Sequence, residues 1–134
     1  MRIVVDTNRV IAALIKDSTS RKIILSKNVE FITINVMKKE VAKYKEEIMR
    51  RANLSMDEFD YLLGKIMSKM TIISDSSVNL YMQKAKGIMD AIDPDDTQFI
   101  AAALAADAYI WTDDKHFEKQ HTVRIIKTRE LLKT

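Results

Sequence analysis

Short apolar runs alternate with longer segments of helical periodicity along this chain, and this alternation limits the folds that it can adopt. The first run, Ile3-Val4-Val5, is entirely β-branched, which is typical of a strand buried on both faces of a sheet. Similar runs predict further strands at residues 31–34, 71–73, 108–111 and 123–126. Because helices separate most of these strands, the pattern predicts an α/β fold with a mainly parallel sheet of about five strands and helices on both faces.

The helical segments are marked by apolar spacing and by capping signals. The helix predicted over residues 36–51 carries Met37, Val41 and Tyr44 on one apolar face. Apolar spacing predicts further helices at 10–15, 23–25, 78–89 and 93–106, and the polar stretch 17–20 separates the first two of these. Two more helices are predicted from capping signals: one begins at the capping box Ser55-x-x-Glu58, and the other begins after the cap residue Thr128.

The composition fits a single globular domain over residues 1–134 and excludes several classes of protein. The chain has no cysteine, so disulfide scaffolds, thiolate metal sites and cysteine nucleophiles are excluded. No apolar run approaches membrane-spanning length and the N-terminus lacks a signal-peptide layout, so we expect a cytoplasmic protein with no membrane partner. The net charge of +3 permits a polyanionic partner.

Acidic residues follow the strands, at the edge where parallel sheets bind their ligands. Asp6 comes directly after the first strand, and Asp113 and Asp114 come directly after the strand at 108–111. Glu40 lies in the helix that follows the second strand. Ligands of open α/β sheets bind beyond the carboxyl ends of the strands, so these acids are expected to share one site.

Helical spacing turns two acids toward the predicted core. Glu40 stands three residues after Met37, and Asp96 stands three residues before Phe99, so each lies on the apolar face of its helix. A carboxylate on a core-facing stripe is costly unless it has partners. Asp93 and Asp95, close to Asp96, form the rest of an acidic group at the start of the alanine-rich helix.

Several carboxylates at one point need a counter-charge. At about 4 Å each pair repels by roughly 1 kcal/mol in water and by about 4 kcal/mol at an effective dielectric of 20. Either some of these groups are protonated or a cation neutralises them. Oxygen ligands without cysteine favour Mg²⁺ or Mn²⁺, and such ions suit phosphodiester cleavage.

Local structural roles are the alternative for every one of these acids. Asp93 can cap a helix that has Pro94 at its first position, with Asp95 near the positive helix end. Asp6 can also be a helix cap, Glu40 a solvated helix residue, and Asp113 and Asp114 turn residues. One shared metal site nevertheless explains the placement of four acids, Asp6, Glu40, Asp96 and Asp114, more simply than four unrelated local roles.

Three segments of the chain resemble the motifs of the PIN domain family. They are Ile3-Val4-Val5-Asp6-Thr7-Asn8, the run from Asp96 to Leu104, and the run from Ala108 to Phe117, which contains Thr112-Asp113-Asp114. The resemblance extends over the whole chain and is strongest to an archaeal-type branch. It implies a three-layer α/β/α sandwich and a ribonuclease of the kind found as VapC-like toxins.

The same resemblance implies roles for individual residues. Asp6, Glu40, Asp96 and Asp114 match the catalytic metal ligands, and Asp93 and Asp113 are further candidates for that role. Asn8 and Thr112 match residues that orient carboxylates or water. Arg9 replaces a small apolar residue, so it either contacts a phosphate or is an ordinary helix arginine. His116 and His121 are interpreted as surface residues.

The resemblance also implies partners. We expect RNA as substrate, an antitoxin protein and a homodimer. The basic residues of the helix that contains Glu40 either hold the RNA backbone or form a solvated face; they are Lys38, Lys39, Lys43, Lys45, Arg50 and Arg51. The alternative function is a PIN-fold RNA-processing or ribosome-associated RNA-binding module with weak or no nuclease activity.

Overall fold

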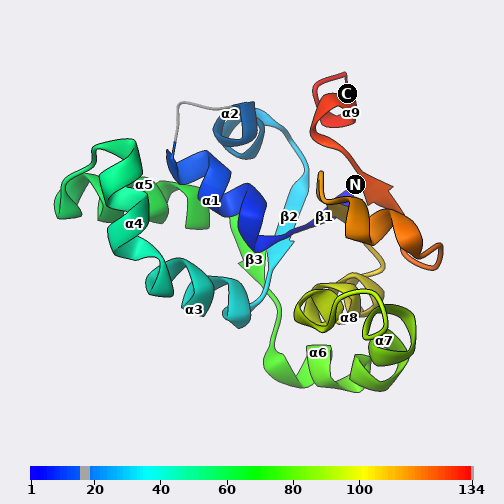
Figure 1. Ribbon diagram of the computed structural model, residues 1–134. Coiled ribbons are helices and arrows are strands. Elements are labelled where there is room, and N and C mark those ends of the chain that lie inside the picture. The colour runs from blue at the N-terminus through cyan, green and yellow to red at the C-terminus, as the bar shows by residue number, and fades with distance from the viewer. Residues whose placement is uncertain (16–18, 134) are drawn as a thin grey trace.

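The computed structural model describes residues 1–15 and 19–133 as one parallel sheet between two layers of helices (Figure 1). The strands are β1 (Arg2–Val5), β2 (Glu30–Thr33), β3 (Met70–Ile72), β4 (Tyr109–Trp111) and β5 (Ile125–Ile126). Their order across the sheet is β3-β2-β1-β4-β5, and every pair is parallel. The α/β prediction and the mainly parallel sheet are therefore confirmed.

The β-branched run at the N-terminus forms the central strand. Ile3, Val4 and Val5 have no exposed surface, because helices cover both faces of the sheet. The register pairs Val5 with Trp111, so the residues that follow β1 and β4 emerge side by side. Across β1, the ring of Phe31 on β2 lies with its centroid 5.9 Å from that of Trp111.

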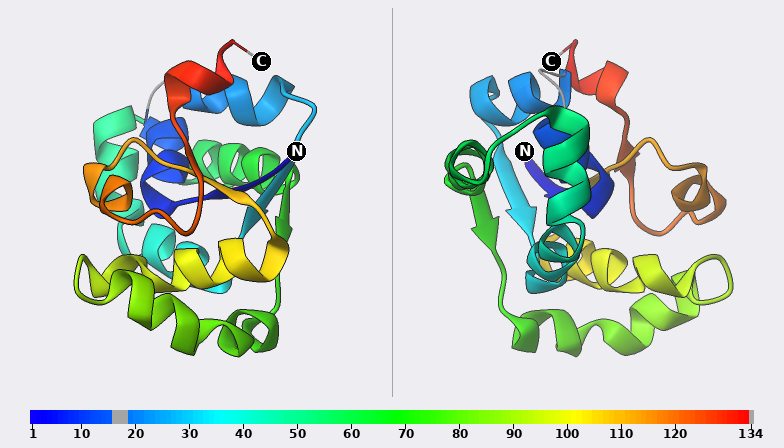
Figure 2. Two further views of the ribbon diagram at one scale, coloured as in Figure 1. Left: turned by 90° about the vertical axis from the view of Figure 1, so that its right-hand side faces the viewer. Right: turned by 60° about the vertical axis from the view of Figure 1, so that its left-hand side comes forward.

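The two helical layers are visible from three directions (Figures 1 and 2). One layer contains α1 (Thr7–Ile15), α2 (Thr19–Ser26), α3 (Asn35–Lys43), α4 (Lys45–Ala52) and α5 (Met56–Met67), with α9 (Thr128–Leu131) beside α2. The opposite layer contains α6 (Asp75–Leu80), α7 (Met82–Met89), the 3-10 turn η1 (Pro94–Asp96) and α8 (Thr97–Ala106). The turn η2 (Lys115–Lys119) connects β4 to β5. None of the helices in the described ranges is long and apolar enough to cross a membrane.

Two helices that the sequence predicts as continuous are interrupted at a tyrosine. The helix predicted over 36–51 divides into α3 and α4 at Tyr44, whose φ of −100° and ψ of 12° lie outside the helical range. Met37 and Val41 on α3 and Ile48 on α4 are buried, while Tyr44 at the junction is 42% exposed. Tyr81 divides the helix predicted over 78–89 into α6 and α7 in the same way.

Other boundaries differ by smaller amounts. The capping box of Ser55 and Glu58 is confirmed at the start of α5. Thr128 was predicted to cap the last helix, but it is the first residue of α9, and its amide donates to the carboxylate of Asp113 at 3.0 Å. The predicted polar break at 17–20 lies partly outside the described residues, and its last two residues, Thr19 and Ser20, are already helical in α2.

The Phe31–Trp111 contact offers a test of the sheet core. Phe31 is 1% exposed, so we expect Phe31→Ala to lower the free energy of unfolding by about 3–5 kcal/mol through lost burial and a residual cavity. Tyr61 is 68% exposed and is the control, because Tyr61→Ala should change stability by less than about 0.5 kcal/mol. Urea denaturation measures both; equal effects of the two substitutions would contradict this packing.

Candidate active site

Asp6 ends the central strand and has its carboxylate inside the protein. The residue is 4% exposed, and its Oδ1 accepts the backbone N–H of Arg9 at 3.0 Å, which caps α1. Burial raises the pKa of Asp6, although hydrogen bonds from Thr112 and Arg9 act in the opposite direction. Asp6 therefore caps α1, as one of the sequence predictions has it, and its carboxylate is also buried, which capping alone does not require.

Thr112 links the ends of β1 and β4. Its hydroxyl accepts the backbone N–H of Asp114 at 3.0 Å and donates to the carboxylate of Asp6. Thr112 itself is 1% exposed, so this connection is held inside the protein. The chain then turns into η2, where Oδ1 of Asp114 accepts the N–H of His116 at 2.9 Å. Thr112 thus contacts both Asp6 and Asp114, and its role in orienting ligand carboxylates stays a prediction.

Asp96 faces the same point from the start of α8. Its pKa is raised to about 7 by burial and by the negative charges of Asp93, Asp114 and Asp6, while His116 acts to lower it. Within the described ranges, its Oδ2 is buried and has no hydrogen-bond partner. Asp6, Asp96 and Asp114, which we call the acidic cluster, are thus brought together by three different segments.

Asp93 and His116 border the acidic cluster. Oδ1 of Asp93 accepts the N–H of Asp95 at 3.0 Å, which confirms the predicted cap. Its Oδ2 lies 3.3 Å from Nδ1 of His116, and the same nitrogen is 3.6 Å from Oδ1 of Asp114. One ligand atom each from Asp93, Asp96 and His116 lie within 4.8 Å of one another, so this edge can also hold a cation. His116 is exposed, as the sequence predicts, and its contact with Asp93 arises only in the fold.

Glu40 approaches the acidic cluster from α3. Its Oε1 accepts the hydroxyl of Thr7 at 2.7 Å, and Thr7 is the residue after Asp6. Glu40 is not among the charges that dominate the pKa of Asp6 or Asp96. Within the described residues, Glu40 is thus connected to the acidic cluster only through Thr7, and it lines a groove together with the exposed Asn8.

Asp113 has a different set of partners from Asp114. Its carboxylate accepts the N–H of Thr128 at 3.0 Å and the hydroxyl of Thr128 at 2.6 Å, and it pairs with Arg9 at 3.0 Å. Burial acts to raise the pKa of Asp113, but these hydrogen bonds and Arg9 bring it below its usual value. Arg9 and Asp113 thus attach α1 and α9 to the end of β4. Arg9, a candidate for contact with a phosphate, is engaged in this ion pair.

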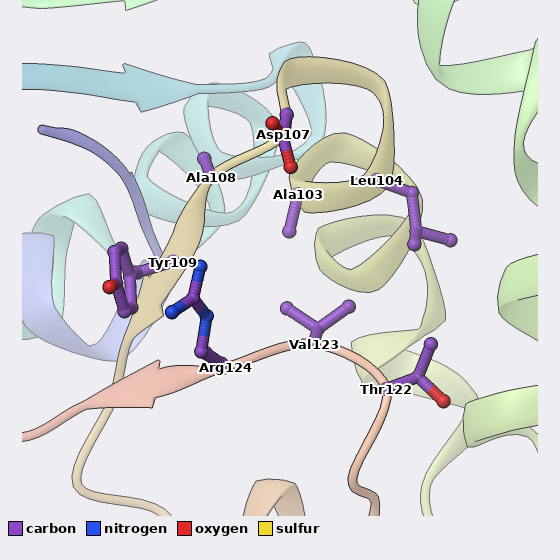
Figure 3. Close-up of a pocket in the computed structure, with 8 residues that line it drawn as sticks. All are labelled: Ala103, Leu104, Asp107, Ala108, Tyr109, Thr122, Val123 and Arg124. Carbon is purple, nitrogen blue, oxygen red and sulfur yellow. The ribbon is translucent and has the colours of Figure 1, made fainter.

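The cavity drawn in Figure 3 lies at the other edge of the sheet. It measures about 210 Å³ and is lined by the end of α8 and by the residues that begin β4 and precede β5. The Arg124 guanidinium lies over the ring of Tyr109, 4.8 Å from its centroid. No member of the acidic cluster lines this cavity.

Comparisons with known proteins agree with the fold. A family model described as PIN domain matches residues 4–133. A similar solved structure is the crystal structure of VapBC2 from Rickettsia felis bound to a DNA fragment from their promoter. The match has a TM-score of 0.70 and 17% sequence identity, and covers 95% of this chain and 98% of that chain. Comparison with curated protein sequences finds no match.

The raised pKa of Asp96 predicts a pH-dependent stability. Without metal, the native state keeps a proton on Asp96 between about pH 4 and pH 7 that the unfolded chain releases. The resulting contribution to the free energy of unfolding is full at low pH and is lost as the pH rises through about 7. Asp96→Asn cannot release this proton and does not suffer the loss. The free energy of unfolding of the variant, minus that of the wild type, should therefore increase as the pH rises from about 4 to about 8.

Urea denaturation in a chelator at several pH values measures this difference. Asp95→Asn is the matched control, because it removes an exposed carboxylate from the adjacent position. If the stability difference between Asp96→Asn and wild type were the same at every pH, Asp96 would not have a raised pKa in the folded protein.

Proposed function

The chain belongs to the PIN domain family, and from this premise we propose that it is a divalent-metal-dependent endoribonuclease. The observation that carries the proposal is the carboxylate of Asp96. One of its oxygens is buried without a hydrogen-bond partner in the described part of the chain, beside the carboxylates of Asp6 and Asp114. Burying such an oxygen is costly, and a bound cation removes that cost.

The donor set fits Mg²⁺ or Mn²⁺. Asp6, Asp96 and Asp114 offer carboxylate oxygens, which are the ligands that these hard cations prefer. Glu40 would complete the set from α3, and Asp93 with His116 would extend it at the outer edge. Divalent ions at such a site activate water for attack on a phosphodiester and stabilise charge on the leaving oxygen.

The residues around the acidic cluster would keep these ligands in position. The N–H of Arg9 and the hydroxyl of Thr112 fix the carboxylate of Asp6, and Thr7 fixes Glu40. Such support holds carboxylates ready before the ion arrives, which reduces the cost of reorganisation. The ion pair of Arg9 with Asp113 keeps α1 against the end of β4.

RNA is the substrate that the surrounding charge favours. Exposed basic side chains are frequent on α3 and α4, and Arg51 lines a groove together with Glu40; the exposed ones are Lys38, Lys39, Lys43, Arg50 and Arg51. Lys45 is instead paired with Asp60 at 3.2 Å. Basic groups beside a metal site attract the phosphate backbone. By family membership we further propose a toxin role in the cytoplasm, with an antitoxin partner and a homodimeric state.

Cleavage of RNA tests this function directly. We expect Mg²⁺- or Mn²⁺-dependent cleavage of a panel of structured RNAs by the wild type, and at least about 100-fold less by Asp6→Asn. Asparagine caps a helix as well as aspartate does, so the variant should still fold. Asp95→Asn is the control and should cleave like the wild type.

The outcomes separate the alternatives. Equal cleavage by wild type and Asp6→Asn would contradict the acidic cluster as the active site. Absence of cleavage by both proteins, with RNA still bound, would favour a PIN-fold binding module.

A further inference from the structure

A groove of about 330 Å³ leads away from Glu40 between α1 and α4. Its lining comes from three elements and consists of Thr7, Asn8, Ile11, Ile15, Glu40, Tyr44, Glu47, Ile48 and Arg51. Figure 1 shows α1 beside α3 and α4, which agrees with the contacts between these helices. The hydrogen bond between Thr7 and Glu40 joins the groove to the acidic cluster, because Thr7 follows Asp6.

Tyr44 is the unusual residue of this groove. It stands at the interruption between α3 and α4, and it is 42% exposed, although helical spacing predicted it on the buried face. The ammonium of Lys43 lies 5.4 Å from the centroid of its ring. An exposed aromatic ring with a cation beside it is a typical platform for stacking a nucleobase.

The rest of the lining suits a base better than a phosphate. Ile48 is buried, and Ile11 and Ile15 are half-buried, so part of the surface is apolar. Glu40 and Glu47 bring negative charge, which repels a phosphate. Asn8 and Glu47 carry groups of the kinds that hydrogen-bond to base edges, and Arg51 supplies a cation for a neighbouring phosphate.

We propose that this groove binds one unpaired nucleobase of the RNA, next to the phosphate that is cleaved, with the base stacked on Tyr44. The inference rests on the proposed function. The volume is near the lower end of the range for ligand pockets, about 300–1,000 Å³, so it is large enough for one base. A base can enter only when it is unstacked and unpaired.

Binding of a short fluorescein-labelled single-stranded RNA, measured by anisotropy in a chelator, tests the groove without requiring cleavage. Tyr44→Ala should weaken binding roughly 5- to 150-fold, the range for loss of one stacked base. Tyr44→Phe keeps the ring and should bind like the wild type. Tyr61→Ala is the matched control, because Tyr61 is also exposed beside a lysine, Lys65, but does not line the groove. The same RNA in a duplex should bind more weakly than the single strand.

Cleavage kinetics separate this inference from the function on which it rests. Where the wild type cleaves RNA, Tyr44→Ala should raise KM by a similar factor and leave kcat nearly unchanged. Unchanged RNA affinity of Tyr44→Ala would overturn the inference, and wild-type cleavage would still support the function. A change of oligomeric state on sedimentation with unchanged RNA affinity would assign the groove to a second copy of the chain and also overturn the inference.

Discussion

The carboxylate of Asp6 is buried at the end of the central strand, and the carboxylates of Asp96 and Asp114 lie around it. A buried carboxylate is stable only when hydrogen bonds or opposite charges compensate for lost hydration. Here the N–H of Arg9 and the hydroxyl of Thr112 supply part of that compensation. Because Thr112 follows β4, the same interaction fixes the end of β4 beside the end of β1.

The strand order explains why this point is available to a ligand. The chain leaves β1 toward β2 over one face of the sheet, and it returns to β4 through the helices of the other face. A crevice forms where the connections separate in this way, beyond the carboxyl ends of the strands. Asp96 reaches this end of the sheet from the start of α8, and Asp114 reaches it from the turn after β4. The crowding of acids therefore follows from the topology.

Asp113 and Asp96 differ in how far the rest of the protein satisfies their carboxylates. Asp113 is satisfied by Thr128 and Arg9, and those partners bring its pKa below the usual value although burial acts to raise it. Asp96 has a buried oxygen without a partner in the described ranges, and its pKa is raised. A bound cation would therefore compensate the carboxylate of Asp96, whereas the carboxylate of Asp113 already has its partners.

Sequence patterns predicted the parts that depend on local chemistry. The β-branched run predicted a strand buried on both faces, and the helical spacing of Asp96 predicted that it faces inward, unlike the exposed Asp95. That Asp6 and Asp96 bind a metal stays a prediction. Sequence patterns did not predict what tertiary contacts decide. The proximity of His116 to Asp93, the ion pair of Arg9 with Asp113 and the exposure of Tyr44 depend on segments that meet only in the fold.

Anomalous diffraction from crystals soaked in Mn²⁺ would show whether the acidic cluster binds a divalent cation. We predict an anomalous peak in ligand contact with Oδ2 of Asp96 and with the carboxylate of Asp6 or Asp114. No peak at saturating Mn²⁺, or a peak only at Asp113, would contradict a metal site at the acidic cluster.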